Sequence, residues 1–94
     1  MTDDLEKRRK RLRFRSWHRG TKENDLLMGR FADAHLAGFD SAALDLYEAI
    51  LDLPDPDLMG WISGQSPLPD GLDNPVMRLL LTFDHAAANL EANR

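Results

Sequence analysis

The clearest helical pattern in this 94-residue chain lies in TKENDLLMGRFADAHLAG, residues 21–38. Its apolar stripe consists of Leu27, Phe31, Ala34 and Gly38 at steps of four, three and four, widened by Leu26 and Met28. This spacing puts the stripe on one face of a helix, and Gly38 is a typical C-terminal stop. The segment therefore predicts a helix that begins near Thr21 and needs other helices to cover one side.

Four more segments share the helical period, and none alternates over the length of a strand. We expect helices from about Asp3 to Ser16, from Asp40 or Ser41 to before Pro54, from Asp55 to Gly64, and from Asn74 to about Ala88. Asp3, Asp55 and Asn74 are the predicted N-caps, with Pro56 and Pro75 at first helical positions. The predicted inward residues are Ala43, Tyr47, Ile50, Leu51, Leu58, Trp61, Ile62, Val76, Leu80, Phe83, Ala87 and Leu90. The predicted fold class is all-α, a compact five-helix bundle.

The composition limits the size and setting of this fold. A chain with 43% hydrophobic residues at this length has room for one core, so we expect a single helical domain over residues 1–94, ordered over about 5–88 and frayed at both ends. The absence of cysteine excludes disulfides and thiolate catalysis. No apolar run has the length of a signal peptide core or a membrane span, and Asp3, Asp4 and Glu6 argue against a transit peptide. We expect a soluble, cytoplasmic protein without a membrane partner.

Charge is divided unevenly along the chain. Residues 1–30 hold ten basic and five acidic side chains, whereas residues 31–94 hold two and eleven. The net charge of −4 therefore conceals a basic first third and an acidic remainder. Such a distribution favours rapid association with a partner of complementary charge.

The pentapeptide Arg19-Gly20-Thr21-Lys22-Glu23 joins the basic segment to the helix at residues 21–38. A glycine between a cation and a carboxylate removes side-chain bulk where the chain turns, so another molecule can approach the backbone closely. Helix capping is the alternative, with Gly20 as N-cap, Glu23 at the third helical position and Arg19 in solvent. The two explanations are compatible, because an exposed helix N-terminus can also contact a partner.

Two motifs at matching spacing carry a resemblance to a known family. Arg15-Ser16-Trp17-His18 leads into the R-G-x-x-E pentapeptide, Asn24-Asp25 follows it, and Asp55-Pro56-Asp57-Leu58-Met59-Gly60-Trp61 comes later. From roughly Arg8 to Asp84 the chain resembles the small assembly factors that promote covalent attachment of FAD to the flavoprotein subunit of succinate dehydrogenase. It departs from them at His18, Thr21 and Asn24, where members often carry Arg or Lys, a bulkier apolar residue and Leu.

The resemblance implies a partner-binding site and not a catalytic one. Arg19, Gly20 and Glu23 match the family's functional residues, and the expected site includes the neighbouring Arg15, Trp17, His18 and Asp25. Arg19 and Glu23 would engage the partner near its flavin, and Gly20 would permit the close approach. Trp17, beside the motif, is the expected exposed interface anchor, because aromatic side chains dominate interface hot spots. Trp61 is expected in the core.

The resemblance also implies the partner and the chemistry. The partner is the flavoprotein subunit of succinate dehydrogenase, with that of fumarate reductase as a second candidate, and this chain is expected to act as a monomer. The bond between FAD and a histidine would form by chemistry of the flavin and the partner. FAD would belong to the partner, and this chain would bind no cofactor stably. The sequence itself shows no catalytic set of nucleophile, base and orienting group, and it contains no Gly-rich loop that would bind phosphate.

The basic run from Lys7 to Arg15 allows three interpretations. It puts seven cations in nine positions, interrupted by Leu12 and Phe14. A nucleic-acid-binding helix would use such a run, but the chain is acidic overall and has no base-reading motif. A solvated helix face and a surface complementary to an acidic protein are the other two. We expect the acidic protein, and we keep a nucleic-acid or general interaction module as the alternative function.

No metal site is predicted. His18, His35 and His85 lie far apart in the sequence, without the spacing of a zinc site. Asp52, Asp55 and Asp57 are interrupted by prolines and lack the glycine and terminal glutamate of a calcium loop, so they indicate helix capping instead.

Overall fold

The computed structural model describes residues 2–83 of the chain, with side chains from residue 4 onward. It contains the α-helices α1 (Thr2–Trp17), α2 (Lys22–His35), α3 (Ser41–Leu51), α4 (Asp55–Ile62) and α5 (Pro75–Thr82), and the 3₁₀ turns η1 (Leu36–Gly38) and η2 (Asp70–Leu72). No strand occurs over these residues. The all-α fold class and the five predicted helices are confirmed.

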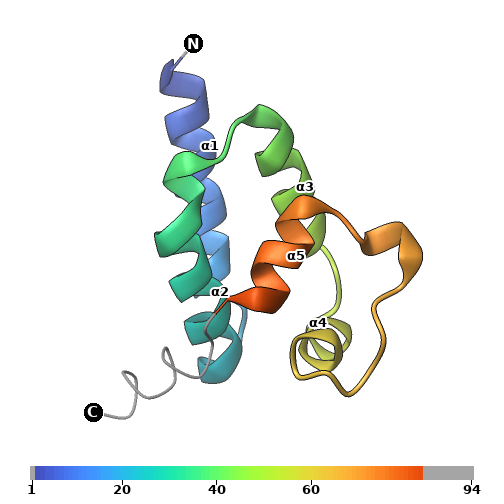
Figure 1. Ribbon diagram of the computed structural model, residues 1–94. Coiled ribbons are helices and arrows are strands. Elements are labelled where there is room, and N and C mark those ends of the chain that lie inside the picture. Colours follow the sequence, from blue (N-terminus) through green and yellow to red (C-terminus); the bar gives the residue numbers. More distant parts are fainter. Residues whose placement is uncertain (1, 84–94) are drawn as a thin grey trace.

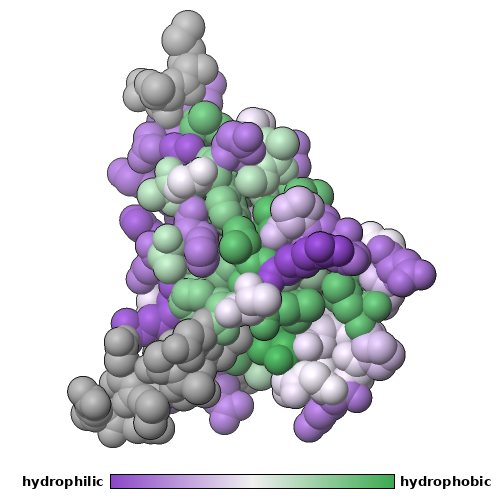
Figure 2. Space-filling view, viewed as in Figure 1, coloured by the Kyte–Doolittle hydropathy of each residue, from purple (hydrophilic) through white to green (hydrophobic). Residues whose placement is uncertain are grey.

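The five helices pack in a series in which each contacts the next, in the order α2, α1, α3, α5 and α4. Antiparallel α1 and α2 lie side by side, and α3 packs on α1 (Figure 1). Helix α5 contacts α3 and α4, and α4 lies at the end of the bundle where α2 begins (Figure 1). On the face that Figure 2 shows, hydrophobic residues gather over α5 and α4, whereas the edge formed by α1 and α2 is mostly hydrophilic. The turn between α1 and α2 lies at the end of the bundle where α4 also lies (Figure 1).

One core joins all five helices. Its fully buried members include Leu12 from α1, Phe31 from α2, Tyr47 from α3 and Met77 from α5. The rings of Phe31 and Tyr47 stack with centroids 5.6 Å apart. Burial of such large side chains supplies most of the stabilisation in a small domain, at about 1.5–3 kcal/mol each.

A buried polar pair fixes α1 against α3. Ser16 is fully buried, and its hydroxyl lies 2.6 Å from the Tyr47 hydroxyl. The Ser16 hydroxyl also donates to the Leu12 carbonyl oxygen at 2.8 Å. Burial raises the pKa of Tyr47 to about 12, because the phenolate would lose its hydration. The pair therefore stabilises the packing only while Tyr47 is protonated.

The capping signals were only partly correct. Asn74 caps α5 as predicted, since its side-chain oxygen accepts from the Met77 backbone N–H at 2.8 Å. Asp55 is not the cap of α4, because the helix begins one residue earlier than expected and Pro54 is the capping residue. The Asp55 carboxylate instead binds an arginine from another part of the chain. The side chain of Asp3, the predicted cap of α1, lies outside the described side chains.

The buried face of α2 differs from the predicted stripe. Leu27 and Phe31 are buried as expected, but Ala34 and Gly38 are exposed. Ala32 and Leu36 are buried in their place. Within α2 the buried face is centred closer to Met28 than the predicted stripe. Beyond His35 the chain forms the 3₁₀ turn η1, so Leu36 and Gly38 no longer follow the α-helical period.

Helix α5 ends earlier than its periodicity predicts. It stops at Thr82, and Phe83 has extended backbone angles of φ −62° and ψ 144°. The Phe83 ring then packs edge-to-face on Phe31 and His35, with centroids 5.6 and 5.8 Å away. These tertiary contacts outweigh the helical periodicity of the sequence. The predicted inward positions Ala87 and Leu90, together with His85 and the predicted C-terminal fraying, lie outside the described residues.

Candidate docking site at the turn between α1 and α2

The turn at residues 18–21 is closed by one carboxylate. Asp25 accepts hydrogen bonds from the backbone N–H groups of Arg19, at 2.5 Å, and Gly20, at 3.2 Å. Gly20 has a φ of +119°, which side-chain-bearing residues rarely adopt. A Cβ atom added there would meet nothing within 4 Å. Gly20 is therefore required by the backbone, and the space above it is open to another molecule.

Helix α2 begins with a hydroxyl cap directly after this turn. The Thr21 hydroxyl accepts from the Asn24 backbone N–H at 3.3 Å, so Thr21 is the N-cap, and Glu23 is the second helical residue. The capping explanation of the motif placed Gly20 at the N-cap and Glu23 one position later, and it is wrong by one residue. The departure from the family at Thr21 has a structural role, because the hydroxyl satisfies an N–H at the helix start.

Arg19 is built into the fold. Only 9% of its side chain is exposed. Its guanidinium donates to the carbonyl oxygens of Leu51, at 2.6 Å, and Leu53, at 3.3 Å. It also donates from Nε at 2.9 Å, and from a second nitrogen, to Asp55 Oδ1. Arg19 therefore ties the turn to the connection between α3 and α4. The capping alternative, which placed Arg19 in solvent, is wrong on this point.

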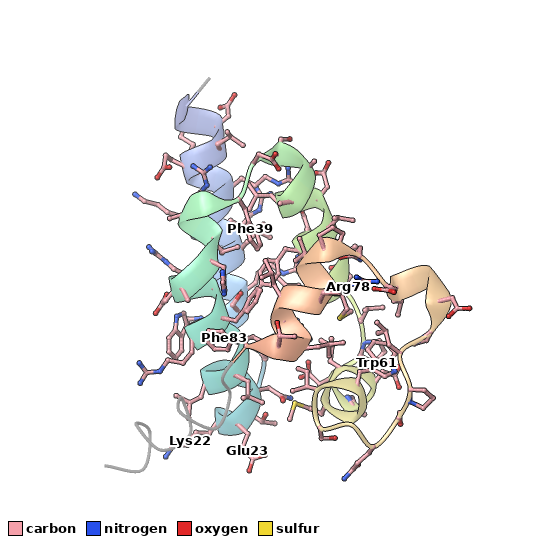
Figure 3. All side chains as sticks on the ribbon, in the orientation of Figure 1. Lys22, Glu23, Phe39, Trp61, Arg78 and Phe83 are labelled. Carbon is pink, nitrogen blue, oxygen red and sulfur yellow. The ribbon has the colours of Figure 1, made fainter. Side chains whose placement is uncertain are left out.

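Glu23 has the opposite environment. Its side chain is exposed, and within residues 2–83 it makes no hydrogen bond or ion pair. Figure 3 shows Lys22 and Glu23 together at the N-terminal end of α2, at the edge of the molecule. A carboxylate at this end is stabilised by the positive pole of the helix and stays available to a cationic partner group. The structure therefore leaves Glu23 free for contact.

Trp17 is half-buried and not the exposed anchor that the sequence predicts. Its ring lies against Gly29 of α2, where an added Cβ would come within 2.2 Å of the indole. The indole N–H donates to Asp33 at 3.2 Å. Trp61 is also half-buried and packs against the core, in agreement with its expected position. Trp17 also lines a surface concavity beside the motif.

His18 and Phe14 form the exposed aromatic group at this site. Their rings stack with centroids 3.9 Å apart and an interplanar angle of 17°. The His18 Nδ1 lies 2.7 Å from the Phe14 carbonyl oxygen. Phe14 is 63% exposed, more than any other large hydrophobic side chain in the described part of the chain. The exposed aromatic beside the motif is therefore Phe14 and not Trp17.

Two surface concavities meet at His18. One is lined by Phe14, Arg15, His18, Arg19, Leu51, Leu53 and Asp55. The other is lined by Trp17, His18, Gly20, Thr21, Lys22, Asp25 and Leu26. The structure therefore brings together every residue predicted for the site, with Glu23 in the first turn of the adjoining helix. This arrangement offers backbone, aromatic and charged groups to a protein surface.

Much of the basic run is neutralised by the chain's own acids. Arg8 contacts Asp45 at 2.5 Å and Glu48 at 3.0 Å, and these hydrogen bonds raise the pKa of Arg8. Arg15 contacts Asp52 at 2.7 Å. The sequence predicts that the basic run binds an acidic partner protein. In the fold, acidic side chains of α3 already bind part of this run. The charge asymmetry along the sequence is partly cancelled when the chain folds.

Sequence reasoning missed several supporting residues. Asp55 holds Arg19 at the turn, Gly29 receives Trp17, and Phe14 supplies the exposed ring. Gly29 carried a signal, because a glycine inside a helix costs about 1 kcal/mol and often marks a close approach. Asp55 carried a signal too, as the first residue of the second motif.

The described residues contain neither a metal cluster nor a membrane helix. Across residues 2–83, no group of three or more His, Cys, Asp or Glu side chains lies close enough to hold a metal ion. No helix in this range is long and apolar enough to cross a membrane.

Comparison with known proteins identifies the family. Residues 10–84 match the family described as flavinator of succinate dehydrogenase. The chain belongs to this family. It is 42% identical over 79 residues to the FAD assembly factor SdhE of Acetobacter pasteurianus, covering 84% of this chain and 72% of that protein.

Mitochondrial proteins are also similar. The succinate dehydrogenase assembly factor 2 of Dictyostelium discoideum is 36% identical over 82% of this chain, and that of Debaryomyces hansenii is 39% identical over 87%. The matches span 55% and 60% of those two proteins. The names describe assembly factors and not enzymes, which agrees with the expected non-enzymatic role. Membership in this flavinator family supports a role in succinate dehydrogenase assembly and flavinylation.

Proposed function

We propose that this chain binds the flavoprotein subunit of succinate dehydrogenase through the turn between α1 and α2, and that it promotes covalent attachment of FAD to a histidine of that subunit. One observation carries the location of the site. Within the R-G-x-x-E motif, the arginine side chain is 9% exposed and tied to the fold, whereas Glu23 is exposed at the adjoining helix start.

The division of roles follows from this geometry. Arg19 and Asp25 hold the turn in one shape before a partner arrives, and this reduces the entropy lost on binding. Glu23 contacts a cationic or hydrogen-bond-donating group of the flavoprotein. Gly20 lets the partner's surface reach the backbone, since a Cβ added there would meet nothing within 4 Å beyond the adjacent residues of the turn.

The bond-forming chemistry belongs to the flavin and the flavoprotein. This chain contributes by holding the partner's domains in the arrangement in which histidine and flavin meet, which is catalysis by positioning. FAD is then bound by the partner and not stably by this chain, which works as a monomer on one partner subunit. The flavoprotein subunit of fumarate reductase is the second candidate partner, and it would need to offer Glu23 the same cationic contact.

A flavinylation assay tests the proposal. The purified chain is mixed with apo flavoprotein subunit and FAD, the proteins are denatured, and covalent flavin is measured by in-gel fluorescence. We expect stimulation by the wild type and little by Glu23→Gln, which removes the charge but keeps the size of the side chain. Asp70→Asn is the matched control, because Asp70 is an exposed acid in η2.

The outcomes are distinct. Stimulation by Glu23→Gln equal to that of the wild type would move the contact away from the motif. Absence of stimulation by the wild type, with a flavoprotein that another assembly factor can flavinylate, would overturn the function. The nucleic-acid alternative has weaker support, because Arg8 and Arg15 are already paired with acids of α3 and its C-terminal turn.

A further inference from the structure

Helix α1 has an outer face that the fold does not use. Lys7, Lys10, Arg11, Phe14 and His18 are all exposed. The first four have the spacing i, i+3, i+4 and i+7, which places them in one row along α1. His18 follows the last residue of α1 and extends the row, because its ring stacks on Phe14. The opposite face carries Leu12 and Ser16, both fully buried. The row therefore faces away from the bundle.

The cations of this row differ from those on the flanks of α1. Arg8, Arg9 and Arg15 each contact an acid of this chain at 2.5–3.0 Å. Among the described side chains, no hydrogen bond or ion pair is made by Lys7, Lys10 or Arg11. Folding thus explains the flank arginines and leaves these three charges without a structural role.

The row is also unfavourable for the isolated helix. Lys7 and Arg11 are like charges at i, i+4, an arrangement that destabilises a helix by about 0.2–0.5 kcal/mol. Phe14 leaves 63% of its surface in water. A bound partner with acidic side chains and an apolar group would relieve both features.

The row is continuous with the motif. Phe14 and His18 stack at 3.9 Å, and His18 lines both concavities at the turn. A partner that contacts Glu23 and covers the turn therefore reaches Phe14 first and the three cations next. Aromatic and arginine side chains are the residue types that most often dominate binding energy.

We infer that the outer face of α1 is a second docking surface, which binds an acidic segment of the flavoprotein subunit with an apolar side chain seated on Phe14. This inference rests on the proposed function, because it extends the binding site of the same partner. The motif supplies the contact near the flavin, and the α1 row supplies charge attraction and an aromatic anchor at a distance from it.

Titration of the apo flavoprotein subunit with the full chain tests the inference at two salt concentrations. We expect Lys7→Gln/Arg11→Gln to weaken binding about tenfold at low salt and to reduce the salt dependence, since exposed charges act mainly through screened attraction. Arg13→Gln is the matched control for one lost charge, because Arg13 is exposed on the same helix but outside the row. It should change binding less than about twofold.

The aromatic contact has its own pair of variants. Phe14→Ala should weaken binding about five- to tenfold at both salt concentrations, because apolar contact is not screened. Leu79→Ala is the control, since Leu79 is 40% exposed on α5. Circular dichroism of all variants verifies that the helices are retained.

Each outcome has one meaning. No binding by the wild type at either salt concentration would overturn the proposed function together with this inference. Wild-type binding that Lys7→Gln/Arg11→Gln and Phe14→Ala leave unchanged would overturn the inference alone. The inference would also fail if the double variant lost binding to an RNA or DNA oligonucleotide, or lost self-association, while binding the flavoprotein normally.

Discussion

The two ends of the R-G-x-x-E motif lie in opposite environments. Arg19 is 9% exposed and donates to Leu51, Leu53 and Asp55, whereas Glu23 is exposed and unpaired within residues 2–83. Five consecutive residues thus contain both a side chain that stabilises the fold, Arg19, and a side chain available to a partner, Glu23. Loss of function at a motif residue therefore does not by itself locate that residue at the interface.

The largest expected effect is that of Arg19→Ala. Removal of the guanidinium leaves Asp55 without its cation and the Leu51 and Leu53 carbonyl oxygens without a donor. We expect the free energy of unfolding to fall by about 2–4 kcal/mol. Urea denaturation followed by circular dichroism measures this change.

Arg11→Ala is the control for Arg19→Ala, because Arg11 is exposed and its loss should change stability by less than about 0.5 kcal/mol. Equal denaturation midpoints for Arg19→Ala and the wild type would place Arg19 with Glu23 as a contact residue. The comparison between the two ends of the motif would then fail.

The second prediction concerns the other anchor of α1, the hydroxyl pair of Ser16 and Tyr47. Burial raises the pKa of Tyr47 to about 12, against about 10 for tyrosine in an unfolded chain. Because the folded state holds the proton more tightly, stability is full below pH 10 and falls as the pH rises towards 12. The loss should approach about 2–3 kcal/mol.

Denaturation of the wild type and Tyr47→Phe at pH 8, 10, 11 and 12 isolates this contribution, since the other groups titrate in both proteins. The free energy of unfolding of the wild type should approach that of Tyr47→Phe as the pH rises. A constant difference between them would mean that the hydroxyl ionises as easily in the fold as in water.

The third prediction concerns Gly20, which lies between the two ends of the motif. Its φ of +119° strains any residue with a side chain, so Gly20→Ala should lower the free energy of unfolding by about 1–2 kcal/mol. Gly38→Ala is the control, because Gly38 has no positive φ and a Cβ there would meet nothing within 4 Å. Urea denaturation should leave this control unchanged or slightly stabilised.

A Gly20→Ala variant as stable as the wild type would show that the turn relaxes without cost. The requirement for glycine would then come from close approach of the partner alone.

The helices and most of their starts could be predicted because their signals are local. The period of apolar residues and the Asn74-Pro75 pair are read within a few positions of the sequence, and the structure agrees with them. The end of α5 could not be predicted in this way. Phe83 leaves the helix to pack on Phe31 and His35, which are far away in the sequence.

The site could be located from the sequence, but its internal organisation could not. The motif and its neighbours mark the correct turn. The bond between Arg19 and Asp55 spans 36 positions, and only the packing of α4 near the turn brings the two side chains together. From the sequence alone, Arg19 could either contact a partner or stabilise the fold. The position of Asp55 in the structure decides between these two roles.

The smallest expected change in stability is that of Glu23→Gln. Its carboxylate makes no hydrogen bond or ion pair within residues 2–83, so the only loss is its attraction to the positive end of α2, about 0.3–0.5 kcal/mol. In urea denaturation, Arg19→Ala should therefore lose several times more free energy of unfolding than Glu23→Gln. Both variants should nevertheless impair flavinylation. A loss of more than about 1 kcal/mol in Glu23→Gln would make this residue part of the fold, and its effect on flavinylation could then no longer be assigned to contact with the partner.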